Sequence, residues 1–354
     1  MRHFFFIPEK GLEEKVARRL QDEVHKADLR VEATVYPALE TPTEKKSPYK
    51  SDSLFISLAE LLMTYSRFRH LLLPRKQTEE KKALVYLGNK LINLFLLHLL
   101  TRKKIIWIRV SQELKEKRIS FFQRLIILKS AEVILTDDQK INRHYRQNLL
   151  PSYFVGNVLA DLCPSSSFEF LHGKNPILAF FPKTDEFEKG FLAYLDLAEK
   201  LWPSNQKYYF LLVIPKGVSI KKVKEIAEKE GWLYCRSFEG DIIEGYLWKQ
   251  SLYINLTRFY SEALEQAELV LSNDPIRIIQ AASIGKKILY TSHKAPEELI
   301  QILNNQVFFF EYCHSMWDRF GARGGLKRLV AYLLWGVVED PRFNQYLSKK
   351  GVGS

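Results

Sequence analysis

The sharpest change in the pattern of apolar and polar positions lies between residues 267 and 290. Residues 269–271 form a short apolar run without helical period, whereas apolar residues within 276–283 recur at the three- and four-residue spacing of a helix face. The turn between them, 272–275, supplies capping oxygens and a proline for the first helical turn. A second apolar run follows at 288–290. This pattern predicts a strand, a helix and a strand, which together form a β-α-β unit of a parallel sheet.

The turn after the first of these strands stands where parallel sheets bind ligands. Ligands lie beyond the carboxyl ends of the strands, where helix N-termini offer N–H groups and a partial positive charge to anions. Ser272, Asn273 and Asp274 are therefore candidates for binding an anionic ligand. A similar strand pattern occurs at 131–136 and runs into Asp137. Its place near the end of the first half suggests that the two halves share one architecture.

Strand and helix patterns alternate along the rest of the chain. In the first half we expect strands at 3–7, 30–36, 84–87, 105–110 and 133–135, and helices at 11–27, 54–73, 91–100, 118–128 and 141–148. In the second half we expect strands at 177–181, 208–214, 232–235 and 307–310, a hairpin or two short strands within 240–255, and helices at 186–201, 220–230, 258–266, 297–303 and 326–338. The fold class is therefore α/β.

The length of the chain predicts more than one domain. At 354 residues it exceeds one ordinary core and suits two α/β domains. Residues 163–174 are rich in proline, serine, histidine and glycine, so we place the boundary there. The predicted domains are residues 1–163 and 174–325, and a last helix within 326–354 is expected to cross back to the first domain.

Composition and charge narrow the class of partner. Apolar residues at 46% and aromatic residues at 13% indicate a globular protein. The 53 Lys and Arg residues exceed the 41 Asp and Glu residues, which gives a net charge of +12. This balance fits a phosphorylated ligand or an anionic membrane, and a lysine-rich surface without any such partner explains it equally well. No nucleic-acid-binding module is recognisable, so nucleic acid is not predicted as a partner.

The three cysteines, Cys163, Cys235 and Cys313, are scattered without metal-binding spacing. We interpret them as packing residues of a protein from a reducing compartment, and we predict neither a metal nor a cofactor. The longest apolar run, 91–100, is too short to span a bilayer. The expected location is cytoplasmic, either soluble or peripheral on the inner face of the membrane.

Three segments carry a resemblance to a known family. Residues 84–110 resemble a strand, glycine turn and aliphatic helix of the GT-B glycosyltransferases, 131–161 resemble the last unit of their first domain and the hinge, and 267–286 resemble their donor-site unit. Within that group the chain most resembles lipid-A-disaccharide synthase and its related-protein family. The resemblance implies two Rossmann-like parallel-sheet domains that face each other across a cleft.

The resemblance also implies a reaction and a donor site. A UDP-sugar, such as UDP-N-acetylglucosamine, would give its hexosyl group to a lipid-linked or glycan acceptor. The second domain would bind the donor and the first domain the acceptor. The candidate donor-binding residues at the corresponding positions are Lys183, Thr184, Ser272, Asn273, Asp274 and Gln280. The competing interpretations are an ordinary loop for Lys183 and Thr184 and a solvated helix position for Gln280.

The donor site departs from the family at three places. The family's second domain opens with a strand followed by Pro-Gly-Ser-Arg, whereas Pro182 is followed here by Lys183, Thr184 and Asp185. Asp274 would repel a diphosphate unless it is paired with a cation. Gln280 stands near the position of the family's glutamate and lacks its charge. These departures leave open an alternative, a catalytically degenerate relative that binds a membrane or a protein.

Two carboxylates are candidates for catalysis, since sugar transfer requires that a proton leave the acceptor hydroxyl. Glu9 follows the first predicted strand and Asp137 follows the strand at 133–135, so both are placed at carboxyl ends. For Asp137 a helix-capping role is the competing interpretation.

Basic residues flank Phe68 and the apolar run at 71–73, a juxtaposition that suits an anionic lipid surface. The predicted membrane patch consists of Arg67, Arg69, Arg75 and Lys76. The competing interpretation is that the apolar residues of this segment belong to the core and the basic ones to the solvated side.

Overall fold

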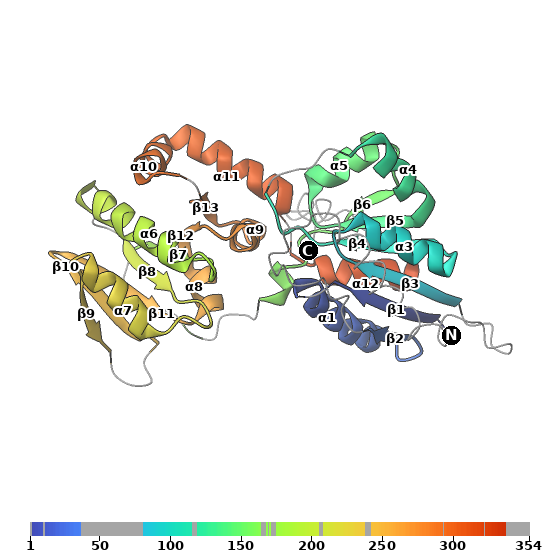
Figure 1. The fold of residues 1–354 in the computed structure, drawn as a ribbon, viewed down its shortest axis with the longest axis horizontal. Coiled ribbons are helices and arrows are strands. Elements are labelled where there is room, and N and C mark those ends of the chain that lie inside the picture. Colours follow the sequence, from blue (N-terminus) through green and yellow to red (C-terminus); the bar gives the residue numbers. More distant parts are fainter. Residues whose placement is uncertain are drawn as a thin grey trace, which may run out of the picture. The chain divides into compact units, whose positions relative to one another are not determined.

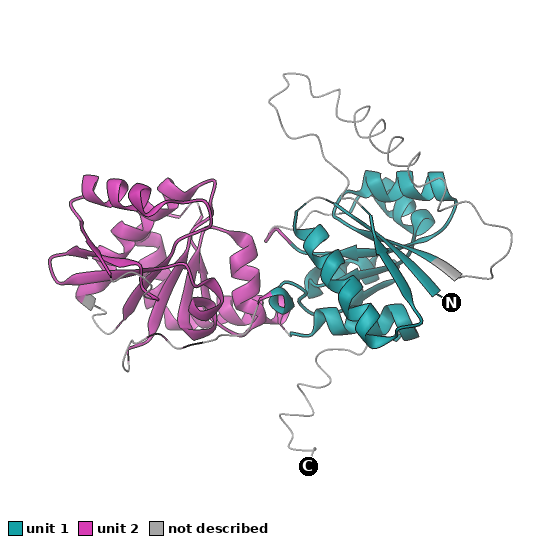
Figure 2. Cartoon of the chain, turned by 90° about the horizontal axis from the view of Figure 1, so that it is seen from below, with its two compact units in different colours: residues 1–111, 115–162, 322–354 teal, residues 112–114, 163–321 magenta. Residues whose placement is uncertain are grey.

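The computed structural model describes residues 2–9, 11–36, 81–114, 119–163, 168, 170, 175–204, 208–237, 242–292, 294–321 and 323–337. The chain forms two compact units (Figure 2). Unit 1 contains residues 1–111, 115–162 and 322–354, and unit 2 contains residues 112–114 and 163–321. Each unit has its own sheet.

The sheet of unit 1 has six parallel strands in the order β2-β1-β3-β4-β5-β6 (Figure 1). The strands are β1 (Arg2–Pro8), β2 (Glu32–Val35), β3 (Lys81–Leu87), β4 (Ile105–Arg109), β5 (Ala131–Thr136) and β6 (Ser152–Phe154). The helices are α1 (Leu12–Ala27), α3 (Leu91–Thr101), α4 (Phe121–Ser130), α5 (Gln139–Gln147) and α12 (Gly325–Trp335), with a short 3-10 turn at Ala160–Leu162. Helix α1 packs against α12, and α3 packs against α4 on the other face of the sheet (Figure 1).

Helix α12 joins unit 1 through its first turn. Asp161 accepts hydrogen bonds from the backbone N–H groups of Gly324 and Leu326, each at 2.8 Å. Gly325 lies so close to the loop after β6 that a Cβ atom there would stand 2.7 Å from the Gly156 carbonyl oxygen. A glycine at this position is therefore required by contact with backbone atoms, which cannot move aside as a side chain can.

The sheet of unit 2 has seven strands in the order β13-β12-β7-β8-β11-β10-β9. They are β7 (Ile177–Phe181), β8 (Tyr209–Val213), β9 (Leu233–Arg236), β10 (Gly245–Lys249), β11 (Leu252–Thr257), β12 (Ala267–Ser272) and β13 (Lys287–Tyr290). The helices are α6 (Phe187–Leu201), α7 (Ile220–Lys229), α8 (Tyr260–Gln266), α9 (Pro275–Ser283), α10 (Pro296–Asn304) and α11 (Gln306–Phe320), with a 3-10 turn at Trp202–Ser204.

Five neighbouring strands of this sheet, from β13 to β11, are parallel, and β10 is antiparallel to both β11 and β9. The predicted hairpin within 240–255 is the β10–β11 pair. The predicted β-α-β unit is β12, α9 and β13. Two α/β domains with predominantly parallel sheets are thus confirmed.

Among the elements predicted within the described residues, one is wrong; the helix predicted at 54–73 lies outside the described residues. Residues 307–310 were expected to be a strand, but they lie in the first turns of α11. The Asn305 side chain accepts a hydrogen bond from the Phe308 backbone N–H and caps this helix. Val307, Phe308 and Phe310 are exposed, so the apolar run is not a buried strand. The helix instead buries one face through residues at helical spacing, Cys313, Met316 and Phe320.

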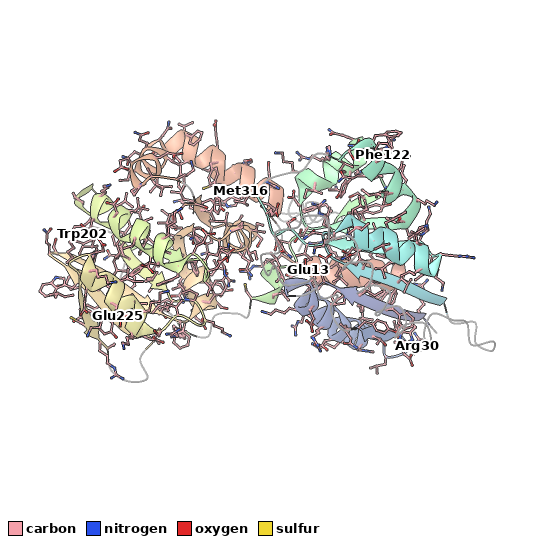
Figure 3. The ribbon with its side chains drawn as sticks, viewed as in Figure 1. Glu13, Arg30, Phe122, Trp202, Glu225 and Met316 are labelled. Atoms are coloured by element: carbon pink, nitrogen blue, oxygen red, sulfur yellow. The ribbon has the colours of Figure 1, made fainter. Side chains whose placement is uncertain are left out.

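Most charged side chains, for example Glu225 and Arg30, point to solvent (Figure 3). Several apolar ones do as well, and Phe122 on α4 is 76% exposed (Figure 3). Within the part of the chain that the structure describes, no helix combines the length and the apolar character needed to cross a bilayer.

Candidate functional site

The carboxyl ends of β7 and β12 are joined by hydrogen bonds between the turns that follow them. The Lys183 backbone N–H donates to Asn273 Oδ1 at 2.7 Å, and the Ser272 hydroxyl donates to the Phe181 carbonyl at 2.5 Å. Both bonds are possible because β7 and β12 are neighbours in register, with Ser272 opposite Phe181. The structure therefore brings together the two turns that the sequence analysis assigned to one donor site.

Asn273 fixes the position of three elements. Its side chain is buried, and it touches Gly190 of α6 so closely that a Cβ atom on Gly190 would stand 2.6 Å from Asn273 Nδ2. Since its carbonyl oxygen also holds the Lys183 N–H, Asn273 links β12, α6 and the turn after β7. The role of Asn273 that the geometry supports is to hold the site in shape.

The N–H groups at the start of α9 are already used within the chain. The Asp274 carboxylate accepts a hydrogen bond from the Ile276 N–H at 2.9 Å, and Pro275 has no N–H to offer. The N–H groups of Arg277 and Ile278 donate to the Asp274 carbonyl. An anion cannot use these donors without displacing Asp274.

The first turn of α6 differs from that of α9, because no side chain caps it. It follows directly after the Lys183 turn. Lys183 itself is paired: its Nζ lies 2.8 Å from Asp185 Oδ2 and 3.2 Å from Glu186 Oε1. The hydrogen bond to Asp185 raises the pKa of Lys183, so the ammonium stays charged. Thr184 lies between Lys183 and Asp185 in the same turn, and its side chain is exposed.

Gln280 lies in a buried polar cluster on α9. Its Oε1 accepts hydrogen bonds from the Tyr260 hydroxyl at 2.5 Å and from Arg277 Nη1 at 3.0 Å, and its Nε2 lies 3.5 Å from Cys163 Sγ. The Arg277 guanidinium lies over the Tyr260 ring, 4.2 Å from its centroid. Gln280 is 5% exposed, so its contacts are within the protein.

Arg277 and Tyr260 also belong to this site and were not predicted from the sequence. Arg277 Nε is 3.6 Å from Asp274 Oδ2, so it is the cation that compensates the carboxylate at this turn. Burial raises the pKa of Asp274, and Arg277 opposes that rise. The spacing of Asp274, Arg277 and Gln280, three residues apart on one helix face, was a signal in the sequence that could have identified Arg277.

In unit 1, Glu9 lies at the carboxyl end of β1 and is nearly surrounded by donors. Its Oε1 accepts hydrogen bonds from the Tyr86 hydroxyl at 2.5 Å and from Asn93 Nδ2 at 2.9 Å, and its Oε2 accepts one from the Asn89 N–H at 3.2 Å. Burial and the neighbouring Glu9 carboxylate raise the pKa of Tyr86. Glu9 thus ties β1 to the turn after β3 and to α3.

Asp137 lies at the carboxyl end of β5 and is fully buried. One carboxylate oxygen accepts a hydrogen bond from the Ser111 N–H at 2.8 Å, and the other has no hydrogen-bond partner among the described residues. Burial raises the pKa of Asp137 to about 7, although Ser111 opposes the rise. The helix-capping role belongs to its neighbour Asp138, whose carboxylate accepts bonds from the N–H groups of Lys140 and Ile141.

Nδ2 of Asn157, in the loop after β6, is among the other buried polar atoms without a partner in the described chain. Ser111, Asp137 and Asn157 follow the neighbouring strands β4, β5 and β6, so the carboxyl edge of unit 1 carries polar side chains of its own.

The predicted membrane patch, Arg67, Arg69, Arg75 and Lys76, lies outside the described residues. Within the described ranges, no group of three or more His, Cys, Asp or Glu side chains could hold a metal ion.

Comparison with solved structures identifies the architecture. MnaA of S. aureus, solved with UDP, superposes with a TM-score of 0.58 at 12% identity, covering 96% of this chain and 98% of that chain. UDP-GlcNAc 2-epimerase from Neisseria meningitidis, solved with UDP-GlcNAc, gives 0.52 at 11% identity, covering 94% and 100%. MurG of Acinetobacter baumannii gives 0.53 at 10% identity, covering 93% and 98%.

The chain has the GT-B fold. The predicted fold class is confirmed, since these proteins match almost the whole chain. No protein-family model and no curated protein matches the sequence. Because the identities are so low, the similarity establishes the fold alone, and the resemblance to lipid-A-disaccharide synthase stays a prediction.

Proposed function

We propose that unit 2 binds a UDP-sugar at the carboxyl edge of its sheet and that the chain transfers the hexosyl group, of the N-acetylglucosamine type, to a lipid-linked or glycan acceptor bound by unit 1. The observation that carries this proposal is the pair of hydrogen-bonded turns, Lys183 to Asn273, at the ends of adjacent parallel strands. It is supported by the fold, which this chain shares with proteins solved with UDP and UDP-GlcNAc.

In this proposal the departing diphosphate lies against the uncapped first turn of α6 and the Lys183 ammonium. Negative charge grows on the diphosphate as the sugar leaves, so a fixed cation and oriented N–H groups stabilise the transition state. Lys183 must first leave Asp185 and Glu186. That exchange costs little, because ion pairs between side chains this exposed contribute about 1 kcal/mol or less.

On the acceptor side the proposed base is Asp137. It has one carboxylate oxygen without a partner among the described residues, and its pKa of about 7 lets it take up and release a proton at neutral pH. Glu9 was the other candidate. Its two oxygens already accept three hydrogen bonds, which suits a positioning role for the loop after β3.

A second candidate function is non-catalytic binding by a degenerate GT-B relative. The observation that favours it is the start of α9, where Asp274 and Pro275 leave no N–H group for a phosphate. Fold alone does not confer activity. A third outcome is 2-epimerisation of UDP-GlcNAc, the reaction for which several structural neighbours are named.

Calorimetry with UDP and UDP-GlcNAc separates these functions at the first step. We expect saturable one-to-one binding of both to the full chain. Proton NMR of UDP-GlcNAc incubated with the protein and an acceptor mixture then distinguishes the reactions. Transfer releases UDP. Epimerisation leaves the bond between the sugar and the diphosphate intact and changes the resonance of the proton on C2. No binding of either ligand would leave the non-catalytic function.

Substitutions at the two turns should change donor affinity in opposite directions. Lys183→Ala removes a charged hydrogen bond and should weaken UDP binding about tenfold. Asp274→Asn keeps an oxygen to cap Ile276 but removes a negative charge, so it should tighten UDP binding. Gln280→Ala should have the smallest direct effect, since its contacts lie within the protein.

The matched control is Lys200→Ala. Lys200 also pairs with two carboxylates, Asp196 and Glu297, and its side chain is 38% exposed against 36% for Lys183. It lies at the other end of α6, so UDP affinity should not change. Equal losses in the two lysine variants would show that Lys183 acts through general charge and not through contact.

Membrane association is proposed separately and rests on the sequence of residues 67–76. Vesicles with anionic lipid should bind the protein more strongly than neutral vesicles, and the quadruple variant of Arg67, Arg69, Arg75 and Lys76 to Gln should lose that preference. Basic residues near an anionic surface contribute roughly 1 kcal/mol each, so the loss should be measurable by co-sedimentation. Equal sedimentation with the two kinds of vesicle contradicts the membrane patch.

A further inference from the structure

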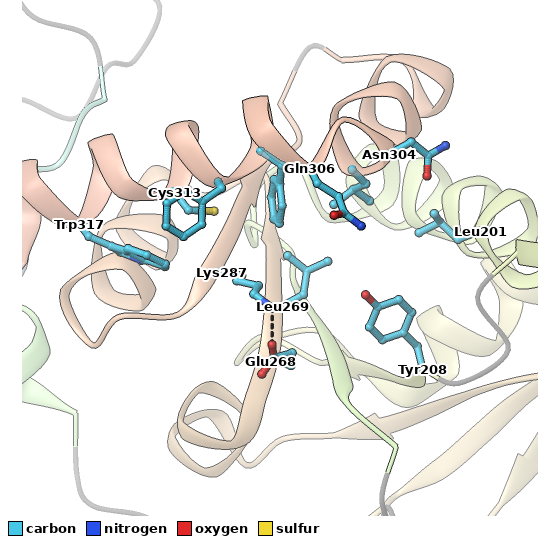
Figure 4. A pocket seen from close by; sticks show the side chains of 12 residues that line it. Leu201, Tyr208, Glu268, Leu269, Lys287, Asn304, Gln306, Cys313 and Trp317 are labelled. Atoms are coloured by element: carbon cyan, nitrogen blue, oxygen red, sulfur yellow. Dashed lines mark hydrogen bonds and ion pairs between the residues drawn. The ribbon is translucent and has the colours of Figure 1, made fainter.

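Unit 2 contains a cavity at the amino edge of its sheet, the edge opposite the proposed donor site. The cavity has a volume of about 370 Å³ and lies below α11, next to the starts of β12 and β13 and the end of α6 (Figure 4). Its lining residues come from these elements, from α10 and from the segment before β8. The following residues line it: Leu201, Tyr208, Glu268, Leu269, Lys287, Leu303, Asn304, Gln306, Phe309, Phe310, Cys313 and Trp317.

The walls of the cavity are held in place by the fold. Trp317 Nε1 donates to the Lys286 carbonyl at 2.7 Å, and Cys313 Sγ lies 3.5 Å from the Ile288 backbone nitrogen. These contacts fix α11 above β13. Leu269 is buried in the sheet, and Leu201 belongs to the end of α6. The cavity is therefore largely pre-formed, as small-molecule sites usually are.

The size of the cavity and its apolar lining indicate what kind of apolar group a ligand would need. Small-molecule sites range over about 300–1,000 Å³, so this cavity suits one ring system and is small for a nucleotide. Four aromatic side chains line it, Tyr208, Phe309, Phe310 and Trp317, together with three leucines. Aromatic side chains pack favourably against another ring through offset or edge-to-face contacts.

The charged residues of the lining indicate which charged groups a ligand would carry. The lining contains one cation, Lys287, and one anion, Glu268, and their side chains pair at 2.5 Å with about half of each exposed. The hydrogen bond to Glu268 raises the pKa of Lys287, so the ammonium of Lys287 stays charged at neutral pH. An ammonium has three donor hydrogens and a carboxylate has about four acceptor positions. After pairing with each other, Lys287 can still donate hydrogen bonds to a ligand and Glu268 can still accept them. A ligand that carries adjacent opposite charges matches such a pair without adding net charge.

We propose that this cavity binds an aromatic α-amino acid, with its ring among the aromatic side chains, its carboxylate on Lys287 and its ammonium on Glu268. The site is separate from the carboxyl edge where the donor is proposed to bind, and it does not depend on the proposed function. A ligand there would contact α11, α10 and β13 and would stabilise unit 2 by mass action.

The test uses three indoles that differ in the charged groups of the side chain: L-tryptophan, tryptamine, which lacks the carboxylate, and indole-3-propionate, which lacks the ammonium. Calorimetry on the full chain should give tightest binding for L-tryptophan. Each missing charge should weaken binding about three- to tenfold, the range for charged contacts that remain partly exposed.

Two substitutions assign each charge to its partner. Lys287→Gln should weaken the binding of L-tryptophan and leave the affinity for tryptamine unchanged, so the preference for L-tryptophan over tryptamine disappears. Glu268→Gln should likewise remove the preference for L-tryptophan over indole-3-propionate. The control is Lys200→Gln, which alters a comparable paired lysine that does not line the cavity.

Leu303→Phe fills the cavity and should abolish binding of all three indoles, and circular dichroism checks that this variant folds. Lys287→Gln is an exposed change that leaves the fold intact, so the test does not depend on Leu303→Phe. No binding of L-tryptophan at millimolar concentration, or equal affinities of the parent chain for the three indoles, overturns the proposal. Unchanged affinity in both Lys287→Gln and Leu303→Phe would place the ligand elsewhere.

Discussion

The Glu9→Ala variant should lose roughly 3–5 kcal/mol of unfolding free energy, because one buried carboxylate holds three donors. Without it the Asn93 amide and the Asn89 N–H lose their acceptor, while the Tyr86 hydroxyl can still turn to the Lys90 carbonyl at 3.0 Å. Urea denaturation followed by circular dichroism measures the change. We expect a lower midpoint for the transition of unit 1.

Two further variants serve as comparisons for the stability of Glu9→Ala. Glu9→Gln keeps an oxygen in place and should lose less than Glu9→Ala. Glu14→Ala removes an exposed glutamate that pairs with Arg18 on α1, and it should change stability by less than about 1 kcal/mol. If Glu9→Ala is as stable as Glu14→Ala but inactive in sugar transfer, Glu9 is catalytic, as the sequence analysis predicted.

The elements that the sequence predicted well have local signals. The β12, α9 and β13 unit is marked by two changes of apolar period, with Asp274 and Pro275 at the helix start. The pairing of the Lys183 and Asn273 turns follows from the parallel sheet, because the first and late strands of such a domain lie together. The first signal lies in neighbouring residues, whereas the second follows from the order of strands in the fold class.

The start of α11 was predicted wrongly because four apolar residues in a row were considered alone. Continued along the helix, Phe309, Cys313, Met316 and Phe320 recur at spacings of four, three and four residues, which is the period of a helix. Their consecutive apolar neighbours, Val307 and Phe308, are exposed and mask that period. A longer window would have corrected the prediction.

The details of the candidate site depend on partners that are distant in the sequence. Gln280 contacts Tyr260 and Cys163, and Asn273 contacts Gly190, so their burial could not be inferred before the fold was known. By contrast, the pairing of Lys183 with Asp185 and Glu186 lies within four consecutive residues. Lys183 was assigned to the donor site without regard to these neighbours, so its pairing was not predicted.

The Asp137→Asn variant should be more stable than the parent chain at high pH. In the unfolded chain this carboxyl loses its proton near pH 3.8, whereas in the folded chain it keeps the proton to about pH 7. Unfolding between these values therefore releases a proton, so the unfolding free energy of the parent chain falls as pH rises through that window. A shift of about three pKa units corresponds to roughly 4 kcal/mol, which is the largest penalty expected above pH 7.

Asparagine has the same shape as aspartate and no proton to lose. In Asp137→Asn one side-chain oxygen can still accept from the Ser111 N–H. Its stability should therefore lack the decline that the parent chain shows between about pH 4 and 7, and the two proteins should converge near pH 4. Asp22→Asn, a change at an exposed position of α1, serves as the control and should follow the parent chain at every pH.

Measured together, stability and activity decide what the buried carboxyl does. Functional residues often cost stability, so a gain in unfolding free energy with a loss of sugar transfer of about a hundredfold or more would identify Asp137 as the base. A gain in stability with unchanged transfer would remove Asp137 from the mechanism and leave the acceptor side without its proposed proton carrier. Parallel stability profiles for Asp137→Asn and the parent chain would contradict the raised pKa itself, and with it the reason for choosing this carboxyl over Glu9.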